Sequence, residues 1–157
     1  MSEMTYRDAI NVALKEEMRR DPSVFVLGED VALYEGSFKV TRGLLAEFGE
    51  ERVKDTPISE NTIIGVSIGA AMGGLRPVAE LMTVNFALLA MDQIINHMAK
   101  IRSMFGGQTF LPMTVRMPGG VAVSLAPSIL KVSKPILCTA RACICSTRPR
   151  RQTQRDF

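Results

Sequence analysis

Glu60 is the residue of this sequence whose surroundings best suit proton chemistry. It stands in the segment DTPISE, at the expected amino end of a helix. A carboxylate in a first helical turn is most often a capping group, because the positive end of the helix dipole favours it. Its neighbours Ile58, Ile63 and Ile64 would exclude water from it, and a desolvated carboxyl is suited to proton transfer. From these residues alone both roles stay open.

Phe86 is a second candidate for contact with a ligand. It follows a short polar segment, Thr83 to Asn85, at the carboxyl end of an expected strand. An aromatic residue in that place is more often part of the core than a surface for a bound ring. The elements around it must therefore decide its role.

Apolar periodicity predicts elements that alternate along the chain. Helices are expected at 5–20, around 42–48, at 60–73 and at 86–104, and strands at 23–30, 75–82 and 109–118. This alternation favours an α/β fold with a parallel sheet and helices on both faces. Functional groups then gather at the carboxyl ends of the strands, so Glu60 and Phe86 are expected near each other at that edge.

Small residues recur in the third expected helix, at Gly65, Gly69, Gly73 and Gly74. Glycine inside a helix costs stability, which suggests a compensating close approach to another backbone. That neighbour could belong to a second subunit.

Composition divides the chain near Gly120. Up to that residue 12 Lys and Arg stand against 15 Asp and Glu, a net charge of −3, whereas residues 121–157 have 7 against 1, a net of +6. The basic tail lacks aromatic interleaving and helical period, so binding to nucleic acid is not expected. Cys143 and Cys145 are too close in sequence for the usual zinc spacing, and no metal site is expected.

The chain as a whole has the composition of an ordinary globular protein. It has 157 residues, of which 46% are hydrophobic and 22% charged, and no apolar run reaches the roughly 18 residues of a membrane span. Its start does not have the form of a secretory signal. A cytoplasmic protein without a membrane partner is expected.

Four segments, in this order and spacing, resemble a known family: GEDVALYEGSFKVTRGL, DTPISE, GAAMGGLRPVAELMTVNF and MDQIINHMAKIRSM. They are similar to the beta subunits of the first component of 2-oxo acid dehydrogenase complexes, with pyruvate dehydrogenase the closest. The resemblance covers residues 4–120. It identifies them as a transketolase-like pyrimidine-binding domain of a thiamine diphosphate enzyme, followed by a tail, 121–157, that does not match.

The resemblance implies roles for three residues. The glutamate matching Glu60 bonds N1′ of the cofactor's aminopyrimidine, the phenylalanine matching Phe86 stacks on that ring, and Ile58 packs beside it. The activity implied is the oxidative decarboxylation of pyruvate, with transfer of the acetyl group to a lipoyl carrier. His97 lies mid-helix and is expected to be a packed or surface residue.

The resemblance also implies partners. The chain has no GDG…N motif for the diphosphate and Mg²⁺, which in the family belongs to an alpha subunit, so the cofactor would lie between two chains. A second beta subunit and a lipoyl acyltransferase core are the other partners implied. Two alternatives stay open: a beta subunit for branched-chain 2-oxo acids or acetoin, and a binding domain that keeps the shape but cannot turn over.

The tail can be explained by a shift of the reading frame. Reading Ser128 to Lys134 one base out of frame gives QHSQSLE, which suits the family at this point. Residues from about Ala122 onward are therefore predicted to be frameshifted and poorly ordered, which would leave the literal chain inactive alone. The DNA sequence across the codons for Gly119 to Ser124 tests that prediction.

Overall fold

A parallel sheet of four strands is the centre of the computed structural model, which describes residues 4–119. The strand order is β2-β1-β3-β4, and all three pairings are parallel. The strands are β1 (Val24–Gly28), β2 (Val53–Asp55), β3 (Arg76–Glu80) and β4 (Thr114–Arg116). The predicted α/β fold is confirmed, while the predicted tail lies outside the described residues.

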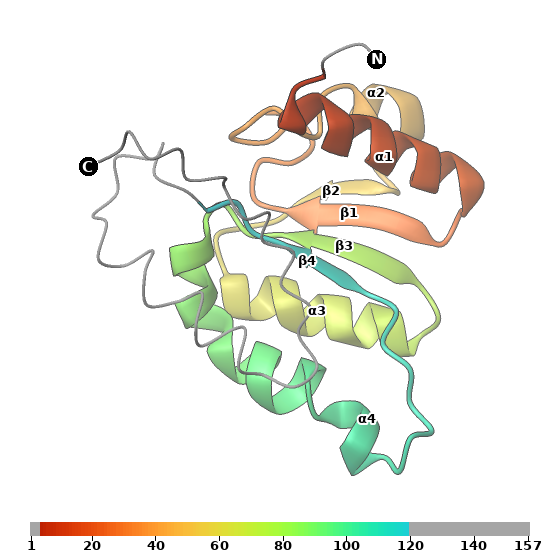
Figure 1. Ribbon diagram of the computed structural model, residues 1–157, viewed down its shortest axis with the longest axis vertical. Coiled ribbons are helices and arrows are strands. Elements are labelled where there is room, and N and C mark those ends of the chain that lie inside the picture. Colours follow the sequence, from red (N-terminus) through yellow and green to blue (C-terminus); the bar gives the residue numbers. More distant parts are fainter. Residues whose placement is uncertain (1–3, 120–157) are drawn as a thin grey trace, which may run out of the picture.

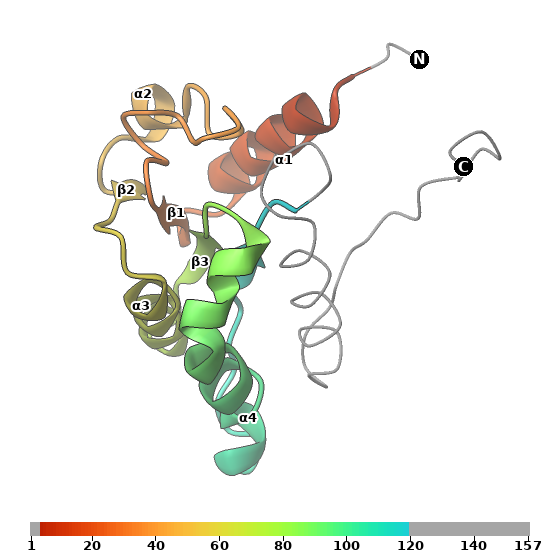
Figure 2. The ribbon, with the colours of Figure 1, turned by 90° about the vertical axis from the view of Figure 1, so that its left-hand side faces the viewer.

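Helices cover both faces of the sheet (Figures 1 and 2). The helices α1 (Tyr6–Arg20) and α2 (Leu44–Phe48) lie on one face, and α3 (Glu60–Met72) lies on the other together with the helical segment that joins β3 to β4. Side chains of β1 alternate between the two layers. Phe25 and Leu27 pack in the core under α3, and Val24 and Val26 pack in the core under α1.

The first helix begins and ends as the sequence predicts. Thr5 caps it, since its hydroxyl accepts a hydrogen bond from the backbone N–H of Asp8 at 3.1 Å. Leu14 and Met18 pack toward the sheet. The helix ends at Asp21, whose backbone N–H donates to the carbonyl of Glu17.

Strand β2 was not predicted. It is an edge strand of three residues in which only Val53 is buried, so it has no apolar run that a sequence pattern could reveal. Arg52 fixes its start, because the guanidinium donates hydrogen bonds to the backbone carbonyls of Met18, Asp21 and Val24.

The prediction of one regular helix over 86–104 was wrong. The segment consists of a 3₁₀ helix η1 (Val84–Ala90), a π-helix η2 (Asp92–Met98) and a short α4 (Ile101–Met104). The buried residues of η1 are Val84, Ala87 and Ala90. Their spacing of three matches the three residues per turn of a 3₁₀ helix, which keeps all of them on one face.

Among residues 4–119, no helix combines the length and the apolar character that crossing a membrane requires.

Candidate functional site

Glu60 lies at the carboxyl edge of the sheet. Strand β2 ends at Asp55, and the chain turns there to begin α3 with Glu60 as its first residue. The Glu60 side chain is buried, with a residue exposure of 5%. The backbone N–H of Ile63 donates to the carbonyl of Ser59 at 2.9 Å and closes the first helical turn around it. A buried acid thus lies in the first turn of a helix, where the helix dipole favours negative charge.

Phe86 comes to the same edge from a different strand. Strand β3 ends at Glu80, and η1, which carries Phe86, begins at Val84. Phe86 is half-buried, and η1 packs against α3. Because all the strands are parallel, Glu60 and Phe86 share one edge, as the sequence predicted.

Ile58 does not shield Glu60 as expected. Its residue exposure is 81%, whereas Ile63 and Ile64 are buried in the core under α3. Ile58 lies in the short non-helical segment that joins β2 to α3. The Ile58 side chain is therefore free of the core and available to contact a bound molecule.

Glu29 is a functional candidate that the sequence analysis did not single out. It directly follows β1, is 6% exposed, and its Oε1 atom has no hydrogen-bond partner among the described residues. Burial raises the pKa of the Glu29 carboxyl, and the charges of Glu60 and Asp30 raise it further. The signal was present, because GED closes a fully buried strand and polar groups at such an end tend to be functional.

The loop after Glu29 holds that residue in place. Asp30, Glu35 and Lys39 have left-handed backbone angles, with φ of 55°, 61° and 56°. The Asp55 carboxylate accepts hydrogen bonds from two loop amides, at 2.6 and 3.1 Å. Strained backbone fixed by specific contacts is common beside functional sites, and here it fixes the end of β1.

A buried ion pair lies on the opposite face of the same edge. Arg116 donates two hydrogen bonds to the Glu80 carboxylate, at 2.9 and 3.0 Å. Both residues are largely buried, with side-chain exposures of 17% and 6%. The pair ties β4 to β3 next to Gly28, where a Cβ would lie 2.3 Å from the Glu80 carbonyl oxygen.

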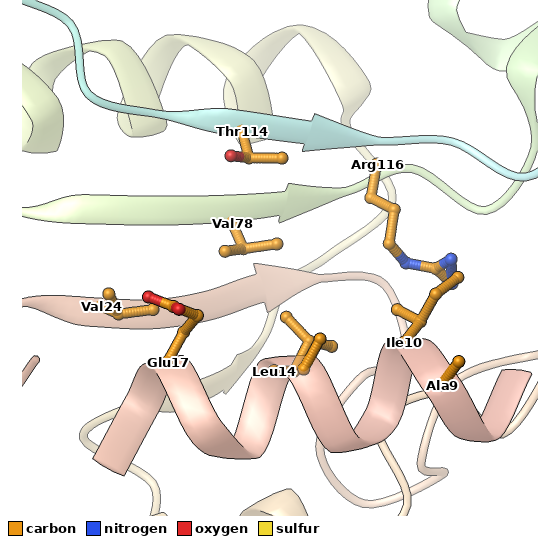
Figure 3. A pocket seen from close by; sticks show the side chains of 9 residues that line it. Ala9, Ile10, Leu14, Glu17, Val24, Val78, Thr114 and Arg116 are labelled. Carbon is orange, nitrogen blue, oxygen red and sulfur yellow. The ribbon is translucent and has the colours of Figure 1, made fainter. Parts of the chain in front are cut away.

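An apolar groove of about 390 Å³ lies between α1 and the sheet, on that opposite face (Figure 3). Ile10, Leu14 and Val78 are among its walls. Arg116 reaches over one end toward α1, but its guanidinium is already bound to Glu80. Glu29 and Glu60 lie on the α3 face, so the groove is separate from the acidic pair.

His97 takes no part in this site. It lies in η2, is exposed, and its Nδ1 is 3.6 Å from a carboxylate oxygen of Asp92 on the same helix. This agrees with the expectation of a packed or surface helix residue.

The sequence of this α/β domain matches a known family. The model of the transketolase pyrimidine binding domain family matches residues 2–126, and the chain belongs to that family.

Within this family, the chain is similar to beta subunits of the pyruvate dehydrogenase E1 component. The chain is 55% identical over 126 residues to the pyruvate dehydrogenase E1 component subunit beta of Rhizobium meliloti (strain 1021), which covers 80% of this chain and 27% of that protein. It is 51% identical to subunit beta-1, mitochondrial, of Arabidopsis thaliana, covering 78% and 34%. With the mitochondrial subunit beta of Homo sapiens the identity is 49%, covering 79% and 34%. The chain thus spans only about a third of the length of these relatives.

Proposed function

We propose that this chain supplies the pyrimidine half of a thiamine diphosphate site in a pyruvate dehydrogenase beta subunit. The observation that carries the proposal is a buried acidic pair, Glu29 and Glu60, beside the exposed apolar side chain of Ile58. A buried acid next to uncovered apolar surface is suited to a ring that carries basic nitrogens.

The residues present fit that half of the cofactor. An aminopyrimidine needs a carboxylate to bond a ring nitrogen and apolar side chains to hold its faces. Glu60 is such a carboxylate, and Ile58 and Phe86 are the apolar groups on the same edge. The unpartnered Oε1 atom of Glu29 adds a buried acceptor next to them.

Each residue has one task in the proposal. Glu60 would donate a hydrogen bond from its carboxyl group to the basic N1′ of the ring and share that proton with it. Phe86 stacks on the ring, Ile58 packs beside it, and both exclude water from the bond to Glu60. Glu29 stays protonated up to a higher pH than an ordinary glutamate, because burial and the charge of Glu60 raise its pKa. When bound, the cofactor supplies the electron sink for decarboxylation of a 2-oxo acid.

The diphosphate half is assigned to another chain. Among residues 4–119 no three His, Cys, Asp or Glu side chains are grouped so as to hold a metal ion. We therefore expect an alpha subunit to bind Mg²⁺ and the diphosphate. The names of the relatives favour pyruvate as the substrate over branched-chain 2-oxo acids or acetoin.

The helix α3 is the proposed contact with partner chains. Among the described residues, nothing lies within 4 Å of a Cβ built at Gly69. This side of the helix is therefore open to a partner chain. A second beta subunit and a lipoyl acyltransferase core complete the proposed assembly. A cytoplasmic location stays a prediction, since mitochondrial and bacterial proteins both stand among the relatives.

Calorimetric titration with thiamine diphosphate tests the proposal. We expect binding when the chain is mixed with an alpha subunit that carries the GDG…N motif, and no measurable binding to either chain alone. Phe86→Ala should weaken the affinity of the mixture by about 10-fold or more, because ring stacking contributes roughly 0.5–1.5 kcal/mol beyond the area buried. Leu89→Ala is a matched control in the same helical segment, where the side chain is 64% exposed.

Two outcomes would contradict the proposal. One is tight binding of thiamine diphosphate to this chain without any partner. The other is binding by the mixture that Phe86→Ala leaves unchanged. Turnover of pyruvate by the mixture then separates an active subunit from a binding domain that has lost catalysis.

A further inference from the structure

Thr56 and Glu29 each follow the last residue of the parallel ladder between β1 and β2. Gly28 pairs with Asp55 as the last assigned register partners. The backbone N–H of Thr56 donates to the carbonyl of Gly28 at 2.9 Å, and this bond closes the last pair of the ladder. Glu29 and Thr56 directly follow that pair on their two strands, and alternation turns both side chains to the face opposite that of Gly28 and Asp55.

That face is the one that α3 covers. Leu27 packs in the core under α3, and Glu29, two residues further along the chain, points to the same side. Glu60 begins α3 at this edge. Thr56, Glu29 and Glu60 thus meet at one corner of the sheet, each from a different element.

Two of these side chains carry buried atoms without a partner. Within residues 4–119, neither Oε1 of Glu29 nor Oγ1 of Thr56 has a hydrogen bond, and both are shielded from solvent. A buried polar group without a partner is costly, because it loses its bonds to water and gains none. A hydroxyl can donate and a carboxylate can accept, so the two unpartnered groups match each other chemically.

We infer that Thr56 is a positioning residue for the acidic pair: its hydroxyl donates a hydrogen bond to the Glu29 carboxylate and holds that side chain beside Glu60. The role of this contact in cofactor binding rests on the proposed function. The contact itself depends only on residues of this chain.

The charged groups around Glu29 determine how a hydrogen bond from the Thr56 hydroxyl affects the Glu29 pKa. Glu60 on α3 and Asp30 after β1 are both negative and raise the pKa of the Glu29 carboxyl. On β2, the Asp55 carboxylate is turned to loop amides, and the Lys54 ammonium donates to a backbone carbonyl. A donated hydrogen bond from Thr56 stabilises the ionised form of Glu29 and acts against the two carboxylates.

Titration of the full chain with ¹³C-labelled glutamate tests this inference without any cofactor. The δ-carboxyl signal of Glu29 is assigned by its loss in Glu29→Gln and followed by NMR against pH. Thr56→Val keeps the shape but removes the hydroxyl, and we expect it to raise the Glu29 midpoint by about 1 pH unit. Thr56→Ser keeps the hydroxyl and should leave the midpoint close to that of the wild type.

An unchanged Glu29 midpoint in Thr56→Val would overturn the inference, as would equal shifts in the valine and serine variants. Thr56→Ala carries the same expectation as Thr56→Val if the valine variant does not fold. Glu60→Gln is the positive control, because loss of its charge should lower the Glu29 midpoint. Failure of thiamine diphosphate to bind would disprove the proposed function but would leave these titrations valid.

Discussion

Glu29 and Glu60 form a buried carboxyl pair at the corner where β1 ends and α3 begins. Burial raises the pKa of Glu29, and the charge of Glu60 raises it further. Because a buried site and a nearby negative charge both disfavour a carboxylate, Glu29 keeps its proton at pH values where an isolated glutamate loses it. Both effects favour the protonated form of Glu29.

Glu29→Gln should make the free energy of unfolding less dependent on pH in the mildly acidic range. From the ordinary carboxyl pKa of 4.5 up to the raised value, the folded state binds more protons than the unfolded state. The free energy of unfolding of the wild type therefore falls as the pH rises through that window. Glutamine cannot titrate, so the variant lacks this contribution. Urea denaturation of both proteins at several pH values measures the difference, and equal slopes would contradict it.

Part of the site could be predicted from the sequence, because edge placement follows from element order. Glu60 and Phe86 each follow an apolar segment or begin a helical one, and parallel strands bring such positions to one edge. The GED segment at the end of β1 marked Glu29 as a polar residue at a strand end, but nothing in the sequence near it indicates which charged group lies close to it in space. The importance of Glu29 comes from the nearby charge of Glu60, which the end of β1 and the start of α3 bring to the same corner of the sheet.

The helical segment between β3 and β4 escaped prediction for a different reason. Its apolar residues suit either a 3.6-residue or a three-residue turn over short stretches, and packing against α3 selects the irregular form. Likewise β2 is stabilised by its backbone pairing with β1, although its own residues are mostly exposed.

Glu80→Gln should lower the free energy of unfolding by about 3 kcal/mol. The substitution leaves the Arg116 guanidinium buried without its carboxylate, and breaking one side of a buried ion pair costs roughly 3–5 kcal/mol. The double variant Glu80→Leu with Arg116→Met removes both charges and should lose less. Chemical denaturation compares the wild type, Glu80→Gln and the double variant, and a double variant less stable than Glu80→Gln would contradict this account.

Gly28→Ala and Gly69→Ala should change stability in opposite directions. A Cβ at Gly28 would lie 2.3 Å from the Glu80 carbonyl oxygen, so β1 and β3 must move apart, at a cost of about 1–3 kcal/mol. A Cβ at Gly69 meets nothing within 4 Å inside α3, and alanine there should stabilise the chain by up to about 1 kcal/mol. Thermal unfolding measures both, and a Gly28→Ala protein as stable as the wild type would show that the two strands lie further apart.

The most direct measurement of the central claim is exchange of the thiazolium C2 proton of thiamine diphosphate for deuterium. It is followed by NMR in the mixture of this chain, restored to the family's reading frame, with an alpha subunit. Glu60→Gln keeps the size of the side chain but replaces the acid by an amide, so the exchange rate should fall by about 100-fold or more. An exchange rate near that of the wild type in Glu60→Gln would contradict the assignment of Glu60 as the proton-sharing residue.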